Sequence, residues 1–269
     1  MSTCISAVQH IRRLRGGSQA QLLRASDGAY YVCKFLNNPQ HTRVLANEML
    51  ATRLGHLLGL PMPQVEIIDV SEWLIEHTPD FRIDLAGSRI PCAPGRHCGS
   101  LYIEQPETSL VVDYLPDELL RTISNIGDFA RVIVLDKWTC NADGRQAVFT
   151  RKKHGRKFSA TFIDQGYCFN AGEWSFPDFP LRGVYAKNCV YESVRGWDQF
   201  EPALTRAEEV GIGEIWEIAR SIPPEWCEFD SDGLQRLVET LYRRRSVIRD
   251  LITQFRTSTR NPFPLWTSR

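Results

Sequence analysis

Four charged side chains follow one another along this sequence in an order that could handle a phosphate group. Lys34 lies in the apolar run "AYYVCKFLNN" (29–38), Glu48 in a helix-like run, and Asp143 and Asp164 in two later segments. Burying an ammonium group without an anionic partner is costly. Lys34 therefore either reaches solvent from an edge strand or is held by an acid for a purpose.

The next acid after Lys34 in the sequence, Glu48, lies on a predicted helix. The run "HTRVLANEMLATRLGHLLGLPMP" (41–63) has apolar residues at helical spacing, with Thr42 able to cap its start and Gly59 near its end. Alternation along the strand places Lys34 on one face and Cys33 on the other. If the helix packs on the sheet, Glu48 can reach Lys34.

A glycine-rich turn, "GGSQ", precedes the lysine strand. Glycines let backbone N–H groups approach phosphate oxygens closely, although a Gly-Gly pair is also common in plain turns. Together with Lys34 and Glu48, the turn predicts the phosphate-binding half of a kinase nucleotide site. The residues expected to cover the phosphates are Gly16, Gly17, Ser18 and Gln19.

Two later segments supply the acids that the other half of such a site needs. "CNADGRQAVF" (140–149) follows an apolar helix and precedes a strand, and it carries Asp143. In "ATFIDQGYCF" (160–169) an apolar strand ends at Asp164, and the X-Gly that follows matches the metal-binding Asp-Phe-Gly element of kinases. Each acid alone fits a turn or a loop cap, but their order favours the kinase interpretation.

These segments resemble the HipA-like kinase family. "NEMLATRLGHLLGLPMPQVEII" is similar to its helix-and-strand element, "CNADGRQAVF" to its catalytic loop and "FIDQGYCF" to its metal-binding segment. The resemblance covers roughly residues 10–170. It implies ATP- and Mg²⁺-dependent phosphorylation of a serine or threonine, often in a toxin–antitoxin or stress setting, with a protein acceptor or an antitoxin-like partner.

The fold implied is α+β and two-lobed, protein-kinase-like and related to phosphatidylinositol kinases. We expect a small N-terminal lobe (1–115), an antiparallel sheet with one main helix, and a larger, mainly helical C-terminal lobe (116–269). Strands are predicted at 63–70 and 108–116, with a Pro/Gly-rich loop (87–99) between them.

The resemblance also implies roles for single residues. Lys34 would hold the α- and β-phosphates and pair with Glu48, Asp143 would orient or deprotonate the acceptor hydroxyl, and Asp164 would bind Mg²⁺. A serine of the glycine-rich loop is autophosphorylated in some members, which makes Ser18 a candidate inhibitory switch. The hinge that meets adenine would be formed by Val112, Asp113 and Tyr114.

The chain departs from the family pattern in its catalytic loop. Val148 replaces an asparagine that usually serves as a second magnesium ligand, and Gln146 or Asn141 is the candidate substitute. Arg145 replaces a histidine and could hold phosphate or the catalytic carboxylate. The alternatives are a nucleotide-binding pseudokinase that acts as a scaffold, a small-molecule or lipid phosphotransferase, and a non-kinase protein in which Lys34 is exposed.

Charge and cysteine usage narrow the possible partners. Thirty-two basic residues balance thirty-two acidic ones, which argues against a broad nucleic-acid surface but leaves room for a local patch. The turn "KHGRK" (153–157) is basic, and Arg243–Arg245 is either a solvated face or a site for an acidic partner on a helical stripe over 232–255.

The apolar runs are too short to span a membrane, and residues 1–17 lack the apolar core of a secretory signal. None of the eight cysteines forms a CxxC pair, so we expect reduced thiols and a cytoplasmic location. Cys92, His97 and Cys98 could begin a zinc site, but no fourth ligand follows at suitable spacing, so a plain loop is favoured.

Overall fold

A closed five-stranded barrel forms the N-terminal part of the chain in a computed structural model that describes residues 5–103 and 108–267. Its strand order is β1-β2-β3-β7-β4, and neighbouring strands are antiparallel except for β1 and β4. The barrel strands are β1 (Ile5–Arg13), β2 (Gln21–Ala25), β3 (Tyr30–Lys34), β4 (Val65–Val70) and β7 (Gly95–Leu101).

The other strands make two smaller sheets. One is the hairpin of β5 (Arg82–Leu85) and β6 (Ser88–Pro91). The other has the order β10-β9-β8 and consists of β8 (Ser109–Val112), β9 (Gln146–Lys152) and β10 (Ser159–Ile163).

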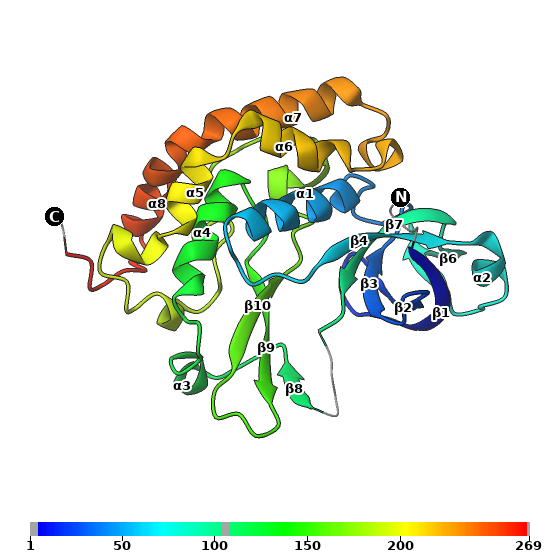
Figure 1. The fold of residues 1–269 in the computed structure, drawn as a ribbon, viewed down its shortest axis with the longest axis horizontal. Helices are drawn as coiled ribbons and strands as arrows, with labels where there is room; N and C mark the ends of the chain where they lie inside the picture. Colours follow the sequence, from blue (N-terminus) through cyan, green and yellow to red (C-terminus); the bar gives the residue numbers. More distant parts are fainter. Residues whose placement is uncertain (1–4, 104–107, 268–269) are drawn as a thin grey trace.

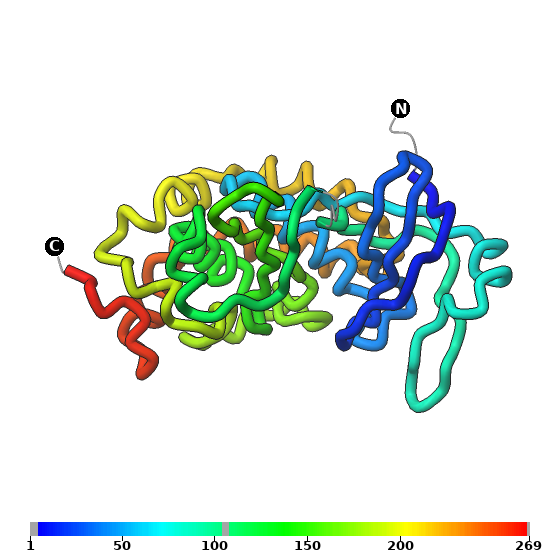
Figure 2. Tube along the Cα trace, turned by 90° about the horizontal axis from the view of Figure 1, so that it is seen from below, coloured from blue at the N-terminus to red at the C-terminus, as the bar shows by residue number. Residues whose placement is uncertain are grey.

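The α-helices are α1 (Val44–Leu57), α2 (Glu72–Glu76), α3 (Asp117–Leu120), α4 (Asp128–Trp138), α5 (Ala203–Glu209), α6 (Ile212–Arg220), α7 (Ser231–Arg244) and α8 (Ile248–Arg256). Short 3₁₀ helices are η1 (Cys168–Glu173), η2 (Asn188–Val190), η3 (Trp197–Phe200), η4 (Pro224–Cys227) and η5 (Arg245–Val247). The barrel lies at one end of the molecule, and α8 with the C-terminal segment lies at the other (Figures 1 and 2).

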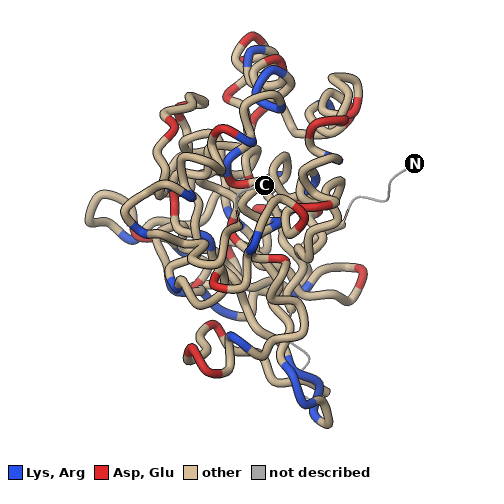
Figure 3. The backbone as a smooth tube through the Cα atoms, turned by 90° about the vertical axis from the view of Figure 1, so that its left-hand side faces the viewer, with Lys and Arg blue, Asp and Glu red and all other residues tan. Residues whose placement is uncertain are grey.

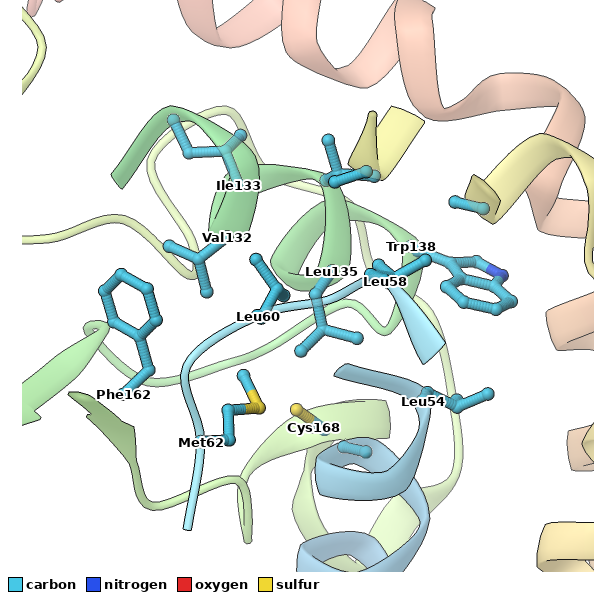
Figure 4. Close-up of a cluster of buried hydrophobic side chains, with 14 of the residues drawn as sticks. Leu54, Leu58, Leu60, Met62, Val132, Ile133, Leu135, Trp138, Phe162 and Cys168 are labelled. Carbon is cyan, nitrogen blue, oxygen red and sulfur yellow. The ribbon is translucent and has the colours of Figure 1, made fainter. Parts of the chain in front are cut away.

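Helix α1 connects the barrel to the helices. It contacts β4 and β7 on one side and α4, α6 and η1 on the other. Leu54 of α1 lies beside Leu135 and Trp138 of α4, and Met62 of the following segment fills the space next to them (Figure 4). The predicted helix is confirmed, but Thr42 does not cap it, because its hydroxyl donates to the carbonyl of Leu36.

The expectation of a loop at 87–99 is wrong. The segment contains β6 and most of β7, and β7 pairs with both β3 and β4 inside the barrel. Gly99 serves close packing here, since a Cβ atom at this position would lie 2.5 Å from Ile68 Cγ1. A glycine that the sequence offers as a breaker is thus a strand residue that lets neighbouring side chains fit.

The strand predicted at 108–116 forms as β8, but it pairs with β9 and not with the barrel. Strand β8 precedes the expected lobe boundary at residue 115, and β9 follows that boundary. Segments from the two expected lobes therefore belong to one sheet. The division into lobes at residues 115 and 116 stays a prediction. The chain is a mixed α/β protein.

The long apolar stripe at 232–255 is divided between α7 and α8 by η5. Arg244 and Arg245, at this break, bond to groups of the protein itself. This differs from both a solvated face and a site for an acidic partner, which were the two interpretations of the sequence. Arg244 is buried and donates to the carboxylate of Asp178 and to the carbonyls of Lys137 and Trp138. Arg245 donates to the carbonyls of Glu208 and Val210.

Seven of the cysteines are free and buried, and Cys4 lies outside the described residues. Within 5–103 and 108–267, no three His, Cys, Asp or Glu side chains are grouped to hold a metal ion, and His97 instead accepts a hydrogen bond from the backbone of Leu36. None of the helices in these ranges has the length and apolar character needed to cross a membrane.

The buried thiols predict alkaline destabilisation. Burial raises the pKa of every one of them above its ordinary value, so the folded chain keeps protons that the unfolded chain loses from about pH 8.5 upward. A thiol lowers the free energy of unfolding by about 1.4 kcal/mol per pH unit between its unfolded-state and its folded-state pKa. Lys137, whose pKa burial lowers to about 8, opposes only one of them.

Urea unfolding under reducing conditions checks this at pH 7.5, 9.0 and 10.0. We expect the free energy of unfolding to fall with increasing steepness across this series. A stability that is flat or rises over it would contradict the assignment of these cysteines as buried, protonated thiols.

Candidate active site

Lys34 is the last residue of β3, and its side chain leaves the barrel toward α1. Tyr31, Cys33 and Phe35 belong to the core inside the barrel, so alternation directs Lys34 to the opposite face. Strand β3 lies between β2 and β7, so Lys34 is not on an edge strand. Lys34 is only 7% exposed, and its ammonium group therefore needs acids nearby.

Two carboxylates meet that need. Lys34 Nζ donates to Glu48 Oε2 at 2.6 Å and to Asp164 Oδ1 at 2.6 Å. The same Glu48 oxygen accepts from the backbone N–H of Gln165 at 3.0 Å. Residues far apart in sequence, on β3, on α1 and after β10, thus converge on one ammonium group.

Lys34 and Asp164 stabilise each other in their ionised forms. Burial by itself would lower the pKa of Lys34, but the negative charges of Asp164 and Glu48 outweigh it and raise that pKa. The positive charge of Lys34 in turn holds the pKa of Asp164 below its ordinary value. A buried ammonium and an anionic Asp164 are therefore both expected at neutral pH.

The backbone around Asp164 is shaped for this contact. Asp164 has φ of 61°, in the left-handed region that residues other than glycine seldom adopt. Two residues on, a Cβ atom on Gly166 would lie 2.8 Å from Lys34 Nζ. The glycine of the Asp-X-Gly order is thus required because a larger residue would crowd Lys34, and the aspartate is required because it pairs with Lys34.

Asp143 lies on the exposed loop between α4 and β9. Gln146, at the start of β9, places its Nε2 atom 3.3 Å from Asp143 Oδ2 and 3.3 Å from Asp164 Oδ2. One side-chain amide thus connects the two carboxylates that the sequence proposed for catalysis and for metal binding. The structure brings together Lys34, Glu48, Asp143, Gln146 and Asp164.

Arg145 lies behind this cluster and not in it. Its side chain is fully buried and forms a two-pronged ion pair with Asp136 of α4. Its remaining nitrogen, Nη1, donates to Gln165 Oε1 at 2.7 Å and to the carbonyl of Ile163 at 3.1 Å. The guanidinium therefore bonds to Asp136, Gln165 and Ile163. The expectation that Arg145 contacts phosphate or the carboxylate of Asp143 is wrong.

Asn141 extends the same network to the loop that carries Asp143. Its amide nitrogen donates to Asp136 Oδ1 at 2.9 Å, and its oxygen accepts from the backbone N–H of Asp143 at 3.1 Å. Asn141 is 1% exposed, so it shapes the loop from inside. Asp136 was missed in the sequence, although a charge within the apolar run "ARVIVLDKW" (130–138) is the same signal that singled out Lys34.

The glycine turn joins β1 to β2, and Gly16 has φ of 123°. Gln19 uses its side chain to bind the backbone N–H and carbonyl of Asp84 on β5. The carbonyl of Ser18 accepts from Asn38 Nδ2 at 3.4 Å. Among the described residues, no hydrogen bond connects the turn (16–19) to the carboxylate cluster.

Of the expected hinge residues, Val112 ends β8, and Asp113 and Tyr114 follow it. Tyr114 is exposed, and its hydroxyl accepts from Lys187 Nζ at 3.2 Å. The same ammonium donates to Asp117 at 2.8 Å and lies 4.3 Å from the Tyr114 ring centre. Lys187 was not singled out in the sequence, because nothing local marks it as a partner of a residue 73 positions earlier.

The barrel, the covering helix and the acid cluster define a kinase-like protein. The structure is similar to the proinflammatory kinase CtkA of Helicobacter pylori, with 14% identity over 90% of this chain and 98% of that one, and a TM-score of 0.54. It is also similar to HipA of Shewanella oneidensis MR-1, solved with HipB and operator DNA, with 13% identity over 93% and 68% of the two chains and a TM-score of 0.55.

The model of the HipA-like kinase family matches residues 7–150, which is more than half of the chain. The chain belongs to the HipA-like kinase family. The match includes Lys34, Glu48 and Asp143 and ends before Asp164. No curated protein sequence matches the chain. Family membership supports phosphotransferase activity, and the resemblance found in the sequence is confirmed.

Removing Arg145 should cost much of the stability. Arg145→Met leaves Asp136 buried without its partner, which lowers the free energy of unfolding by about 3–5 kcal/mol. Arg243→Met is the matched control, because the Arg243 side chain is 67% exposed, and it should change the free energy by less than about 0.5 kcal/mol.

Urea unfolding of the two variants provides the measurement. The double variant Arg145→Met/Asp136→Leu should recover part of the loss, since no buried charge is then unpaired. Equal stability of Arg145→Met and the wild type would show that the pair does not hold the loop.

Proposed function

We propose that this protein is an ATP- and Mg²⁺-dependent kinase of the HipA-like type that transfers the γ-phosphoryl group to a serine or threonine hydroxyl of a protein. The observation that carries the proposal is the position of Lys34 Nζ, 2.6 Å from both Glu48 and Asp164, with Asp164 connected to Asp143 through Gln146. Phosphoryl transfer depends mainly on positioning and charge neutralisation, and this cluster offers both.

Lys34 keeps the capacity to bind phosphate in this arrangement. An ammonium group has three N–H donors, and Glu48 and Asp164 accept two of them. The third can donate to an α- or β-phosphate oxygen. Because Glu48 also accepts from the backbone of Gln165, it fixes Lys34 while the phosphate binds.

The donor set at Asp164 fits Mg²⁺, which prefers carboxylate and amide oxygens. Asp164 and Asp143 each direct one carboxylate oxygen to the same amide of Gln146, so both could face one cation. Asp164 would hold the ion, and Gln146 would join it through its side-chain oxygen if its amide turned so that Nε2 no longer donates to the carboxylates. Asn141 is the less accessible candidate because it is 1% exposed. When bound, the ion neutralises charge on the phosphates.

Asp143 would act on the acceptor. Its carboxylate is exposed, and the backbone of its loop is fixed through Asn141 and by the bond from Gly183 N–H to the Asp143 carbonyl. It would orient the hydroxyl and take its proton as the new O–P bond forms and the bond to the β-phosphate oxygen breaks. Arg145 would position this loop from inside.

Adenine would meet the backbone of Val112, Asp113 and Tyr114, and the turn formed by Gly16, Gly17, Ser18 and Gln19 would cover the phosphates. Phosphorylation of Ser18 would place a dianion in the space for ATP phosphates and inhibit the enzyme. An antitoxin-like protein partner and a cytoplasmic location belong to the same proposal.

A nucleotide-binding pseudokinase is the second candidate, and Val148 favours it. Val148 lies within β9, opposite Thr161, and it has no oxygen in its side chain to offer a second magnesium ion. The longer Gln146 would then have to provide that ligand.

Removal of the Asp164 charge should abolish magnesium-dependent nucleotide binding. We expect ATP to bind the wild type at least about 10-fold more tightly with Mg²⁺ than without it, since the carboxylate and Mg²⁺ act together. In Asp164→Asn this difference should vanish. Calorimetry measures both, and binding that ignores Mg²⁺ in the wild type would favour the pseudokinase.

Asp143→Ala should separate chemistry from binding. We expect phosphoryl transfer to fall by about 10²- to 10⁴-fold, as for loss of a positioned base, while ATP affinity changes little. A quench-flow or radiolabel assay of autophosphorylation gives the rate, and calorimetry gives the affinity. An equal loss of rate and of ATP affinity would count against this role for Asp143.

A further inference from the structure

The turn between β9 and β10 carries the densest positive charge in the described part of the chain. We call residues 151–157 the basic tip. Six of these seven residues can be cationic, and Figure 3 shows the lysines and arginines of this loop in blue at the lower end of the molecule. They are Arg151, Lys152, Lys153, His154, Arg156 and Lys157.

Within residues 5–103 and 108–267, no acid pairs with the charges of the basic tip, and Arg151 contacts the ring of Phe158. All of its residues except Arg151 are exposed, and no ion pair within 4.0 Å joins any of the six to an acid among residues 5–103 and 108–267. Arginines elsewhere commonly have such partners, as in the pairs of Arg96 with Glu225 and Arg121 with Glu192. Among the described residues, the mutual repulsion of these charges is therefore not offset by an ion pair.

The basic tip borders a hollow that could receive a ligand. The hollow has a volume of about 480 Å³ and is open to solvent. Its lining residues are Thr108, Lys152, Lys153, His154 and Gly155. A concave surface with several cations can contact more of an extended anionic chain than an isolated lysine can.

The basic tip is rigidly connected to the candidate active site. Strand β9 runs from Gln146, which contacts Asp143 and Asp164, to Lys152 in the basic tip. Its seven residues span about 20 Å. A polypeptide could therefore contact the basic tip and place a hydroxyl at Asp143 if about six or more extended residues separate the two.

We propose that the basic tip is a docking surface for an acidic segment, rich in aspartate and glutamate, of the polypeptide that the enzyme phosphorylates. This inference rests on the proposed kinase function and specifies its acceptor. Docking at the tip makes the second contact intramolecular, so it raises the local concentration of the hydroxyl at Asp143. It should lower KM for such acceptors and leave kcat unchanged.

A nucleic acid fits the basic tip less well. Single-stranded binding uses exposed aromatic side chains for base stacking, but Phe158, which follows the tip, is buried, and its ring centre lies 4.8 Å from the Arg151 guanidinium carbon. Duplex binding uses phosphate contacts over an extended basic surface, whereas this chain has no net charge. An acidic polypeptide requires only one short cationic surface.

The test is direct binding of a fluorescent ten-residue peptide that alternates glutamate with glycine, measured by anisotropy at about 50 mM salt, where surface charges are weakly screened. The tip variant is Lys153→Glu/Lys157→Glu, with both substitutions outside strands. The matched control is Arg220→Glu/Arg236→Glu, which changes the net charge equally at exposed positions on α6 and α7. A duplex and a single-stranded DNA of equal charge are the competing probes.

We expect the peptide to bind the wild type and the control equally, to weaken with added salt, and to lose at least 10-fold in affinity in the tip variant. Undiminished ATP binding by the tip variant shows that it folds. Absence of peptide binding, or equal binding by the tip and control variants, would overturn the proposal. So would DNA that binds more tightly than the peptide and depends on the same two lysines.

This outcome is separable from that of the proposed kinase function. Peptide binding is measured without nucleotide and should persist in Asp164→Asn. A wild type that binds the peptide but not ATP would overturn the kinase proposal and leave the surface in place. A wild type that binds ATP but not the peptide would overturn the docking proposal and leave the kinase proposal in place.

Discussion

The buried charge of Lys34 is the constraint on which the arrangement of the site depends. An ammonium group removed from water is tolerated only with carboxylates at hydrogen-bonding distance, and Glu48 and Asp164 both lie 2.6 Å away. One carboxylate comes from the helix that covers the barrel and the other from the end of β10. Any shift of α1 or β10 relative to β3 would leave at least one of these charges unpaired.

A second buried ion pair, between Arg145 and Asp136, holds the same region from the other side. Gln165 connects the two pairs, because its backbone N–H donates to Glu48 and its side-chain oxygen accepts from Arg145. The exposed carboxylate of Asp143 and the partly buried carboxylate of Asp164 thus rest on a buried polar framework. The hydrogen bonds between these groups favour one geometry over many, while Gln165 Nε2 is buried without a hydrogen-bond partner among the described residues.

Much of the site could be predicted from the sequence because its signals are local. Lys34 is a charge in an apolar strand, Glu48 lies on the next helix, and Asp164 ends a strand before X-Gly. Hydrophobic periodicity and turn residues indicate these features, and neither requires that the fold be known. The prediction that Glu48 faces Lys34 is confirmed, and the interpretation of Lys34 as an exposed edge residue is wrong.

What the sequence did not provide depends on packing between distant segments. Strand β7 was expected to be a loop, because Gly95 and Gly99 suggest breaks when the crowding of Gly99 by Ile68 is unknown. Arg145 was expected near phosphate, because a charged residue beside a catalytic acid gives no sign that Asp136 lies behind it. Strand propensity likewise does not indicate which sheet a strand joins, so the pairing of β8 with β9 could not be predicted.

The sequence by itself determined which residue types carry the chemistry, their order along the chain and the elements that hold them, since hydrophobic period and turn residues act over a few positions. Only the tertiary structure decided which charges face the solvent and which pair internally. It directed Arg145 inward, left the basic tip without an internal partner among the described residues, and joined Asp143 to Asp164 through Gln146. The physical reason is that the free energy of a charge depends on its surroundings in space, and those are set by long-range packing.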